Sequence, residues 1–201
     1  MSDPTIRPLS PALVDDFLGF FDHECGPAFA DNPQWAKCYC HFYEVPLAIE
    51  WGSLAASDNR VSMRARIETG EMEGFLAYEG ADVVGWMNAQ PRHKLPHCFA
   101  RLGAAPTPLP CPPHEAAVIV CFVISPQRRR SGIARTLLSG GLASLAARGI
   151  RLVDAFPFKA GKSAAPADHY HGPQSLFLAE GFTVLREDEN LSVLRKGLRA
   201  D

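Results

Sequence analysis

The stretch Ala116–Ala134, AAVIVCFVISPQRRRSGIA, organises the rest of the chain. Residues 116–124 are an unbroken apolar run rich in β-branched side chains and stopped by a proline, which predicts a strand buried on both faces. After Gly132 the apolar residues recur at helical spacing as far as Leu145, and Gly149 stands where a helix C-terminal glycine belongs. The sequence therefore predicts a unit of strand, turn and helix.

The turn of this unit combines positive charge with small residues. A helix N-terminus has unpaired backbone N–H groups and a partial positive charge, so it binds anions and phosphates in particular. Gly132 and Ala134 carry no large side chain that would keep a diphosphate from the backbone, and Arg128, Arg129 and Arg130 add positive charge. The turn is therefore a candidate phosphate site. The alternative is a run of solvated arginines between a strand and a helix.

A family resemblance rests on the spacing of this stretch. The residues that carry it are Val123, Pro126, Arg129, Gly132, Ile133, Ala134, Leu137 and Leu138. Their pattern resembles the acyl-CoA-binding signature of the GNAT superfamily of N-acetyltransferases. The resemblance implies that backbone N–H groups from Arg129 to Ala134, that of Ser131 included, hold the pyrophosphate of acetyl-CoA. It also implies that the main chain at Cys121 and Val123 pairs with the pantetheine arm.

The resemblance extends from about Thr5 to Arg195 and implies a fold. The expectation is an α/β (α+β) protein: one GNAT-like domain over residues 1–201, with a mixed central sheet, a splayed cofactor strand and flanking helices. The segment Gly74–Trp86 looks like the central hairpin of the family. In that setting Trp86 and Asn88 are expected near the acceptor substrate, although Trp86 also suits a packed core.

Composition narrows the class of protein. The chain has 201 residues, 47% of them hydrophobic, which is ordinary for a globular protein. Its formal net charge of −2 argues against a surface that binds nucleic acid without sequence specificity. No apolar run approaches the length of a membrane span, and the first residues lack the apolar core of a signal peptide. Six cysteines in a chain with ample core residues favour reduced thiols and a cytoplasmic location. Whether the chain forms a homodimer stays open.

Two cysteines lie close together in an aromatic segment, Trp35–Tyr43. If this segment is extended, Cys38 and Cys40 share one face. With His41 they suggest zinc, but the spacing is tighter than zinc sites use and a second pair of ligands would have to come from residues 93–114. We therefore expect no metal, and we expect Cys38 and Cys40 in a packed or substrate-facing segment.

Two further segments have expected structures. Residues 51–70 are predicted to be helical, with a cap at Ser57-Asp58, an end at Gly70 and solvated arginines. Residues 91–114 contain seven prolines, three histidines and two cysteines. An inserted loop of this length is usually functional or disordered, so we expect a lid over the acceptor pocket, with disorder as the alternative.

Both familiar catalytic groups of the family are replaced in this chain. Many members have a tyrosine that acts as general acid at the position where this sequence has Phe177. One branch has a glutamate that acts as general base at the position where this sequence has Val118. The remaining candidates are Tyr170, before the last helix, and His114 and Glu115, before the cofactor strand. A chain of water molecules is the alternative route for the proton.

Together these observations predict an N-acetyltransferase that moves an acetyl group from acetyl-CoA to a small-molecule amine by direct transfer. No metal, nucleic acid or membrane partner is expected. A degenerate acetyl-CoA-binding sensor or interaction module is the alternative, because the familiar catalytic groups are missing. A metal-dependent interaction protein built on Cys38 and Cys40 comes third.

Overall fold

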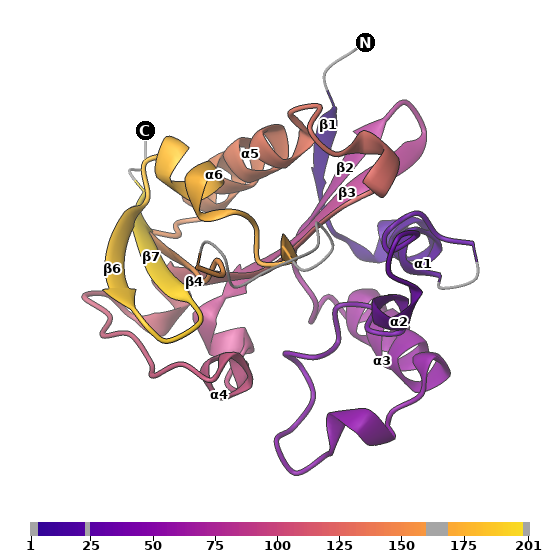
Figure 1. Ribbon diagram of the computed structural model, residues 1–201, viewed down its shortest axis with the longest axis horizontal. Coiled ribbons are helices and arrows are strands. Elements are labelled where there is room, and N and C mark those ends of the chain that lie inside the picture. The colour runs from indigo at the N-terminus through magenta and orange to yellow at the C-terminus, as the bar shows by residue number, and fades with distance from the viewer. Residues whose placement is uncertain (1–3, 23–24, 160–168, 199–201) are drawn as a thin grey trace.

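A single mixed sheet forms the centre of the molecule. The computed structural model describes residues 4–22, 25–159 and 169–198. Within these residues seven strands are hydrogen-bonded in the order β1-β2-β3-β4-β5-β7-β6 (Figure 1). The strands are β1 (Thr5–Pro8), β2 (Phe75–Glu79), β3 (Asp82–Pro91), β4 (Ala116–Ile124), β5 (Leu152–Ala155), β6 (Thr183–Glu187) and β7 (Ser192–Gly197). The expected fold class, a mixed sheet flanked by helices, is confirmed.

Strand β4 lies at the middle of the sheet, and eight of its nine residues are buried. It is antiparallel to β3 along its length but parallel to β5 over only Ala116–Ile119. Beyond Ile119 the two strands are no longer paired, so the second half of β4 has an open edge. This divergence is the splayed strand that the family resemblance implies.

A β-bulge in β4 changes which side chains face which layer. Cys121 is paired with Asn88 while Ile119 is paired with Ala89, which leaves Val120 as the extra residue. The alternation of side chains is interrupted there. As a result Ile119 packs in the cluster under helix α5 (Ile133–Ala147), whereas Cys121 belongs to the cluster on the opposite face.

Helices cover both faces of this sheet. Helices α5 and α6 (Gln174–Ala179) lie on one face, and α1 (Val14–Phe21), α2 (Pro33–Ala36) and α3 (Ala56–Glu68) lie together on the other (Figure 1). The short helix α4 (Cys98–Leu102) packs against the N-terminal half of β4, where Phe99 of the helix joins the cluster that contains Val118 and Val120. The 3-10 turns are η1 (Pro11–Leu13), η2 (Trp51–Ser53), η3 (Arg92–Lys94), η4 (Pro113–Glu115) and η5 (Pro126–Arg128).

The segment expected to be helical over 51–70 divides into η2 and α3. The helix begins at Ala56 with Ala55 as its N-cap, so the predicted cap at Ser57-Asp58 lies too far along the chain; Asp58, inside the first turn, accepts a hydrogen bond of 2.9 Å from the backbone N–H of Ala55. The arginines of α3 are not merely solvated, which corrects the expectation. They pair with carboxylates at 2.7 Å in each case: Arg60 with Asp22, Arg64 with Asp15, and Arg66 with Glu44.

The cysteine segment is not extended, so the condition under which Cys38 and Cys40 would share a strand face is not met. Helix α2 is followed by tight turns, and Tyr39 and Cys40 have φ angles of 45° and 56°. Residues other than glycine rarely adopt this left-handed backbone conformation, which costs of order 1 kcal/mol per residue. Tyr39 is held there by burial and by a 3.0 Å hydrogen bond from its hydroxyl to Asp22.

Residues 91–114 are ordered by specific contacts. The guanidinium of Arg92 donates to Thr107 at 2.8 and 2.9 Å, and the Thr107 hydroxyl donates to the buried carboxylate of Asp154 at 2.6 Å. Arg195 completes this cluster by binding Asp154 at 2.7 and 2.9 Å. These bonds fasten the insertion to β5 and β7, so its position is determined by the sheet.

Candidate functional site

The open edge of β4 exposes main-chain groups that a ligand could bind. Ser125 donates from its backbone N–H to Val84 on β3, so by alternation Val123 and Cys121 also face β3 while Phe122 and Ile124 face the open edge. The backbone N–H of Phe122 donates to the carbonyl oxygen of Tyr170, in agreement with this register. The expectation that the main chain of Cys121 and Val123 meets the pantetheine arm is therefore wrong by one residue.

The turn after β4 has the backbone geometry of an anion cradle. Arg130 and Gly132 have φ angles of 62° and 89°, and α5 begins at the next residue, Ile133. Among the described residues, none provides a hydrogen-bond partner for the backbone N–H groups of residues 130–134. A Cβ added at Gly132 would meet no atom of the chain within 4 Å, so the space over this turn is open to a ligand.

The three arginines of the turn are placed differently. Arg128 pairs with Glu79 at 3.0 Å, and Arg129 pairs with Asp31 and donates to the carbonyl oxygen of Ile124. Arg130 is exposed, and no ion pair links it to another described residue. The hydroxyl of Ser131 donates to the carbonyl of Arg128 and so closes the turn rather than facing a ligand.

A groove of about 530 Å³ runs along the open edge and the turn. We call it the cofactor groove. Its walls are the end of β4, residues of the turn from Arg128 to Ala134, and the segment that leads into α6, which includes His169 and Tyr170. A long, phosphate-bearing ligand fits this shape, because one end has free N–H groups and arginines while the rest is a strand edge.

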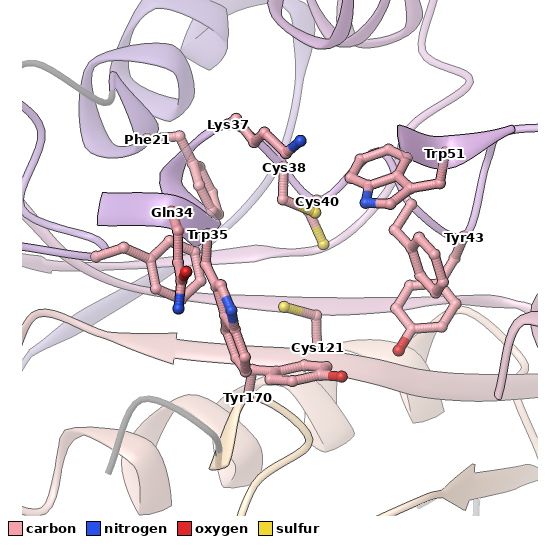
Figure 2. Close-up of a pocket in the computed structure, with 12 residues that line it drawn as sticks. Phe21, Gln34, Trp35, Lys37, Cys38, Cys40, Tyr43, Trp51, Cys121 and Tyr170 are labelled. Carbon is pink, nitrogen blue, oxygen red and sulfur yellow. The ribbon is translucent and has the colours of Figure 1, made fainter. Parts of the chain in front are cut away.

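A smaller cavity of about 190 Å³ adjoins the groove, and we call it the chamber (Figure 2). Half of its twelve lining residues are aromatic residues between positions 21 and 51: Phe21, Phe29, Trp35, Phe42, Tyr43 and Trp51. Gln34 and Lys37 supply polar groups, and Cys38, Cys40 and Cys121 line one side. Phe29 and Tyr170 line both cavities, so the chamber and the groove meet there.

No residue of the insertion 91–114 lines the chamber, so the insertion does not cover this cavity. Segment 29–51 forms the wall instead. The insertion acts behind it: Arg101 donates to the carbonyl oxygens of Val45, Pro46 and Ile49, and its guanidinium lies over the ring of Phe42.

Three thiols converge at the chamber. Figure 2 shows Cys38 and Cys40 pointing toward Cys121. Burial raises the pKa of Cys38 to about 12, and the neighbouring Cys40 adds to the effect. The pKa of Cys121 is raised well above its ordinary value by its hydrogen bond to Cys40 and by burial. The pKa of Cys40 is lowered: burial opposes this, but hydrogen bonding from Cys121 and Asn88 and the nearby indole N–H of Trp86 outweigh burial.

Trp86 and Asn88 lie behind the chamber and not on its surface. Both are fully buried, and neither lines either cavity, so direct contact with an acceptor, as expected from the sequence, has no support in the geometry. The side-chain nitrogen of Asn88 donates to the sulfur of Cys40 at 3.2 Å. Both residues therefore act on the site through Cys40.

The catalytic candidates occupy different places. Tyr170 lies at the junction of the two cavities, and its ring packs edge-on against Trp35 at 4.6 Å between centroids. His114 and Glu115 precede the other end of β4 and line neither cavity. Glu115 and His114 lie seven and eight positions before Phe122, or roughly 23–26 Å along an extended chain. Glu115 pairs with Arg151 at 3.1 Å, so the geometry separates these two residues from Tyr170.

Phe177 and Val118, which stand where other family members have a catalytic tyrosine or glutamate, are both packed in the core. Phe177 is fully buried and packs against Phe122 and Phe182, with centroids 6.0 and 5.3 Å away. Val118 is fully buried on the α4 side of β4. Neither position faces a cavity, which agrees with the absence of a polar group there.

Sequence reasoning missed a buried pair beside the chamber. The hydroxyl of Tyr43 and Nε2 of His171 are 3.3 Å apart. Burial lowers the pKa of His171 to about 3, so this imidazole is neutral, and its Nδ1 has no hydrogen-bond partner among the described residues. Adjacency of His171 to Tyr170 was the only available signal, because Tyr43 lies 128 residues away along the chain.

Neither a metal site nor a membrane-spanning helix occurs among the described residues. No group of three or more His, Cys, Asp or Glu side chains in this part of the chain could hold a metal ion. None of the helices resolved in these residues is both long and apolar enough to cross a bilayer.

A family model and solved structures provide comparisons. The model of the acetyltransferase (GNAT) family matches residues 34–171. A search of curated proteins finds no significant match. Solved structures with similar folds include the GNAT domain of S. lividans PAT, with TM-score 0.57 and 16% identity over 97% of this chain and 90% of that one.

Two further structures show the range of this likeness. PaiA N-acetyltransferase from Thermoplasma acidophilum, in complex with coenzyme A, has TM-score 0.55 and 13% identity over 98% of this chain and 99% of that one. The ribosomal-protein-S18-alanine N-acetyltransferase from Escherichia coli has TM-score 0.51 and 12% identity over 97% and 94%. At this level of identity the likeness concerns the fold.

Proposed function

The chain belongs to the GNAT family of acetyltransferases, and from this premise we propose that it transfers an acetyl group from acetyl-CoA to a small amine held in the chamber. The observation that carries the proposal is the junction of the two cavities at Phe29 and Tyr170. The cofactor groove suits a CoA molecule, and the chamber suits an acceptor. A thioester at the junction would lie beside the acceptor's nitrogen, as acyl transfer requires.

The residues of the groove fit the phosphates and the arm of CoA. The N–H groups of residues 130–134 and the open space over Gly132 suit the diphosphate, and Arg130 has no competing ion pair with a described residue. The carbonyl oxygen of Phe122 and the N–H of Ile124 face the edge along which the arm would lie, whereas the N–H of Phe122 is bonded to Tyr170 and the carbonyl oxygen of Ile124 accepts from Arg129. Bound acetyl-CoA would supply the reactive thioester.

The chamber indicates the chemical class of the acceptor. Its wall is mainly aromatic, its volume is about 190 Å³, and no carboxylate lines it. An amine with a compact apolar body therefore fits better than a highly charged one, and aromatic faces attract a cationic nitrogen. The same features favour a small molecule over a protein N-terminus, although one structurally similar enzyme is named for acetylating a ribosomal protein.

Tyr170 is the proposed proton donor to the leaving CoA thiolate. A phenol is protonated at neutral pH and is matched to a thiolate better than a carboxylic acid is. His114 and Glu115 are not retained in this role, because they lie away from the junction. We also propose a cytoplasmic location, since all six cysteines are free thiols and such thiols persist in reducing compartments.

Two measurements test this function. Calorimetry with CoA tests the groove, and thiol release from acetyl-CoA in the presence of arylalkyl amines, aliphatic amines and short peptides tests the transfer. We expect CoA to bind and arylalkyl amines to give the fastest release. CoA binding with no transfer to any amine would support the alternative, a sensor of acetyl-CoA, which the apolar Phe177 and Val118 also favour. Absence of CoA binding would overturn both.

A further inference from the structure

We propose that Cys40 is the nucleophile of a two-step transfer, in which its sulfur carries the acetyl group between acetyl-CoA and the amine. This inference rests on the proposed function and replaces direct transfer with an acetyl-cysteine intermediate. It assigns a covalent modification site to a residue that the family signature does not include.

The first support is the position of Cys40. Its side chain lines the chamber next to Cys121, and the chamber meets the cofactor groove at Tyr170. Cys40 is 3% exposed and has a φ angle of 56°, so an unfavourable backbone conformation holds it at this wall. Strain of this kind is stored where the surroundings require a side chain to point in one direction.

The second support is a set of donors directed at the sulfur. Asn88 donates from Nδ2 at 3.2 Å. The indole N–H of Trp86 is fully buried and makes no hydrogen bond of ordinary geometry with any described residue, yet it lies close enough to Cys40 to lower the pKa of that thiol. A buried N–H without a partner is costly, and a negatively charged sulfur is the acceptor that would satisfy it.

The orientation of Asn88 is itself held by a buried relay. Its Oδ1 accepts from Gln90 at 3.0 Å, Gln90 also donates to Glu44 at 2.7 Å, and Glu44 pairs with Arg66. With the amide oxygen of Asn88 occupied in this way, its NH₂ group is directed toward Cys40. A neutral thiol accepts such a bond only weakly, whereas a thiolate accepts it strongly, so the donor stabilises the ionised form of Cys40 more than the neutral form.

The third support is the asymmetry of the three thiols. Burial and the neighbouring sulfurs raise the pKa of Cys38 and Cys121, whereas the pKa of Cys40 is lowered. The S–H of Cys121 serves as one of the donors to Cys40. Of the three thiols, Cys40 therefore loses its proton most readily, and the thiolate is the nucleophilic form of cysteine.

The two steps balance in atoms and charge. In the first, the Cys40 thiolate attacks the acetyl carbonyl, a C–S bond to Cys40 forms, the C–S bond to CoA breaks, and the leaving thiolate takes a proton, for which Tyr170 is the proposed donor. In the second, the neutral amine attacks the same carbon, the C–N bond forms, the C–S bond to Cys40 breaks so that Cys40 leaves as a thiolate, and the nitrogen gives one proton to the phenolate left on Tyr170, which restores the phenol. Because a thioester is exchanged for a thioester, the first step needs no further reagent.

Isotope exchange tests this step without an acceptor. Labelled CoA is mixed with unlabelled acetyl-CoA and the whole protein, and label is followed into acetyl-CoA. We expect exchange in the wild type and a hydroxylamine-sensitive acetyl group on Cys40, located by tandem mass spectrometry. Cys40→Ser and Cys40→Ala should abolish both signals. Cys98→Ser, which alters a buried thiol away from both cavities, should retain them.

Calorimetric binding of CoA separates the possible failures. If the wild type binds CoA and acetylates an amine but shows neither exchange nor labelling, the inference is overturned and direct transfer stands. An acetyl group on Cys38 or Lys37 in place of Cys40 would also overturn it. If either Cys40 variant folds poorly, its binding of CoA reveals this, and the acetyl-cysteine in the wild type then decides the question. Failure of the wild type to bind CoA would reject the proposed function itself.

Discussion

The backbone N–H of Phe122 donates a hydrogen bond of 2.5 Å to the carbonyl oxygen of Tyr170. This bond ties the segment before α6 to the open edge of β4 by main-chain atoms alone. A substitution in the side chain of Tyr170 therefore leaves the tie intact, and its effect on catalysis can be separated from an effect on the fold.

Replacing Tyr170 with phenylalanine should lower the turnover number about a hundredfold or more while the affinity for acetyl-CoA hardly changes. The phenol is removed, but the ring contact with Trp35 and the main-chain bond to Phe122 remain. Steady-state kinetics with a working acceptor measure the effect. If the variant retains more than about half of the turnover, Tyr170 is a packing residue and water donates the proton.

Tyr78→Phe is the matched control for this change. The Tyr78 hydroxyl donates to Asp16 at 2.7 Å, and Tyr78 lines neither cavity. Its loss should cost about 1 kcal/mol of stability and leave the turnover number unchanged.

Replacing Gly132 with valine should weaken CoA binding at least tenfold, or about 1.4 kcal/mol. The new side chain enters the space over the turn, which no atom of the chain occupies. Gly149→Val is the control, because Gly149 also has a positive φ (85° against 89°) and open surroundings but lies at the other end of α5. Equal destabilisation of both variants with unchanged calorimetric affinity would mean that the diphosphate binds elsewhere.

His171 should make the protein less stable in acid. Its pKa is lowered by burial to about 3 in the folded protein, against 6.5 for an ordinary histidine. Below pH 6.5 this histidine binds a proton in the unfolded chain but not in the folded one. The free energy of unfolding therefore has its full value above that pH. It then falls by up to about 1.4 kcal/mol per pH unit as the pH drops toward 3.

Denaturant unfolding at several pH values between 7 and 3.5 checks this dependence. His171→Asn should flatten it, whereas His114→Asn should not, since the His114 side chain is 68% exposed. Parallel curves for the wild type and His171→Asn would contradict a buried neutral histidine.

Replacing Asp154 with asparagine should destabilise the fold by about 3 kcal/mol, because Arg195 then loses its buried charge partner. The Asp154 side chain is 1% exposed and also accepts from Thr107. Asp188→Asn breaks the Arg186 pair, whose side chains are 33% and 26% exposed, and should cost less than about 1 kcal/mol. Chemical denaturation compares them, and equal costs would show that the Asp154 cluster does not fasten the insertion.

The strand, turn and helix around Gly132 could be predicted from sequence because their signals are local. Apolar run, proline, arginines, glycine and helical spacing all lie within one stretch, and the structure has β4, η5 and α5 there. The hairpin of β2 and β3 was equally readable. The family resemblance then supplied the mixed sheet and the splayed edge.

The chamber could not be predicted, because its wall depends on long-range packing. Tyr39 and Cys40 adopt positive φ angles that no local propensity favours. The bulge at Val120 shifts the register by one residue, and only the pairing with β3 reveals it. The insertion was expected to close over the acceptor, but the ion pair of Asp154 with Arg195 and the bonds of Thr107 draw it toward β5 and β7.

Arg101 links the insertion to the acceptor wall by holding three carbonyl oxygens of residues 45–49 and stacking on Phe42. The two segments therefore depend on each other structurally. Transplanting segment 29–51 into another scaffold without the helix that carries Arg101 would remove the support of its loop. A mutant library that aims to change the range of acceptors should accordingly vary both segments together. Variants of segment 29–51 alone would include conformations that Arg101 and its helix do not stabilise.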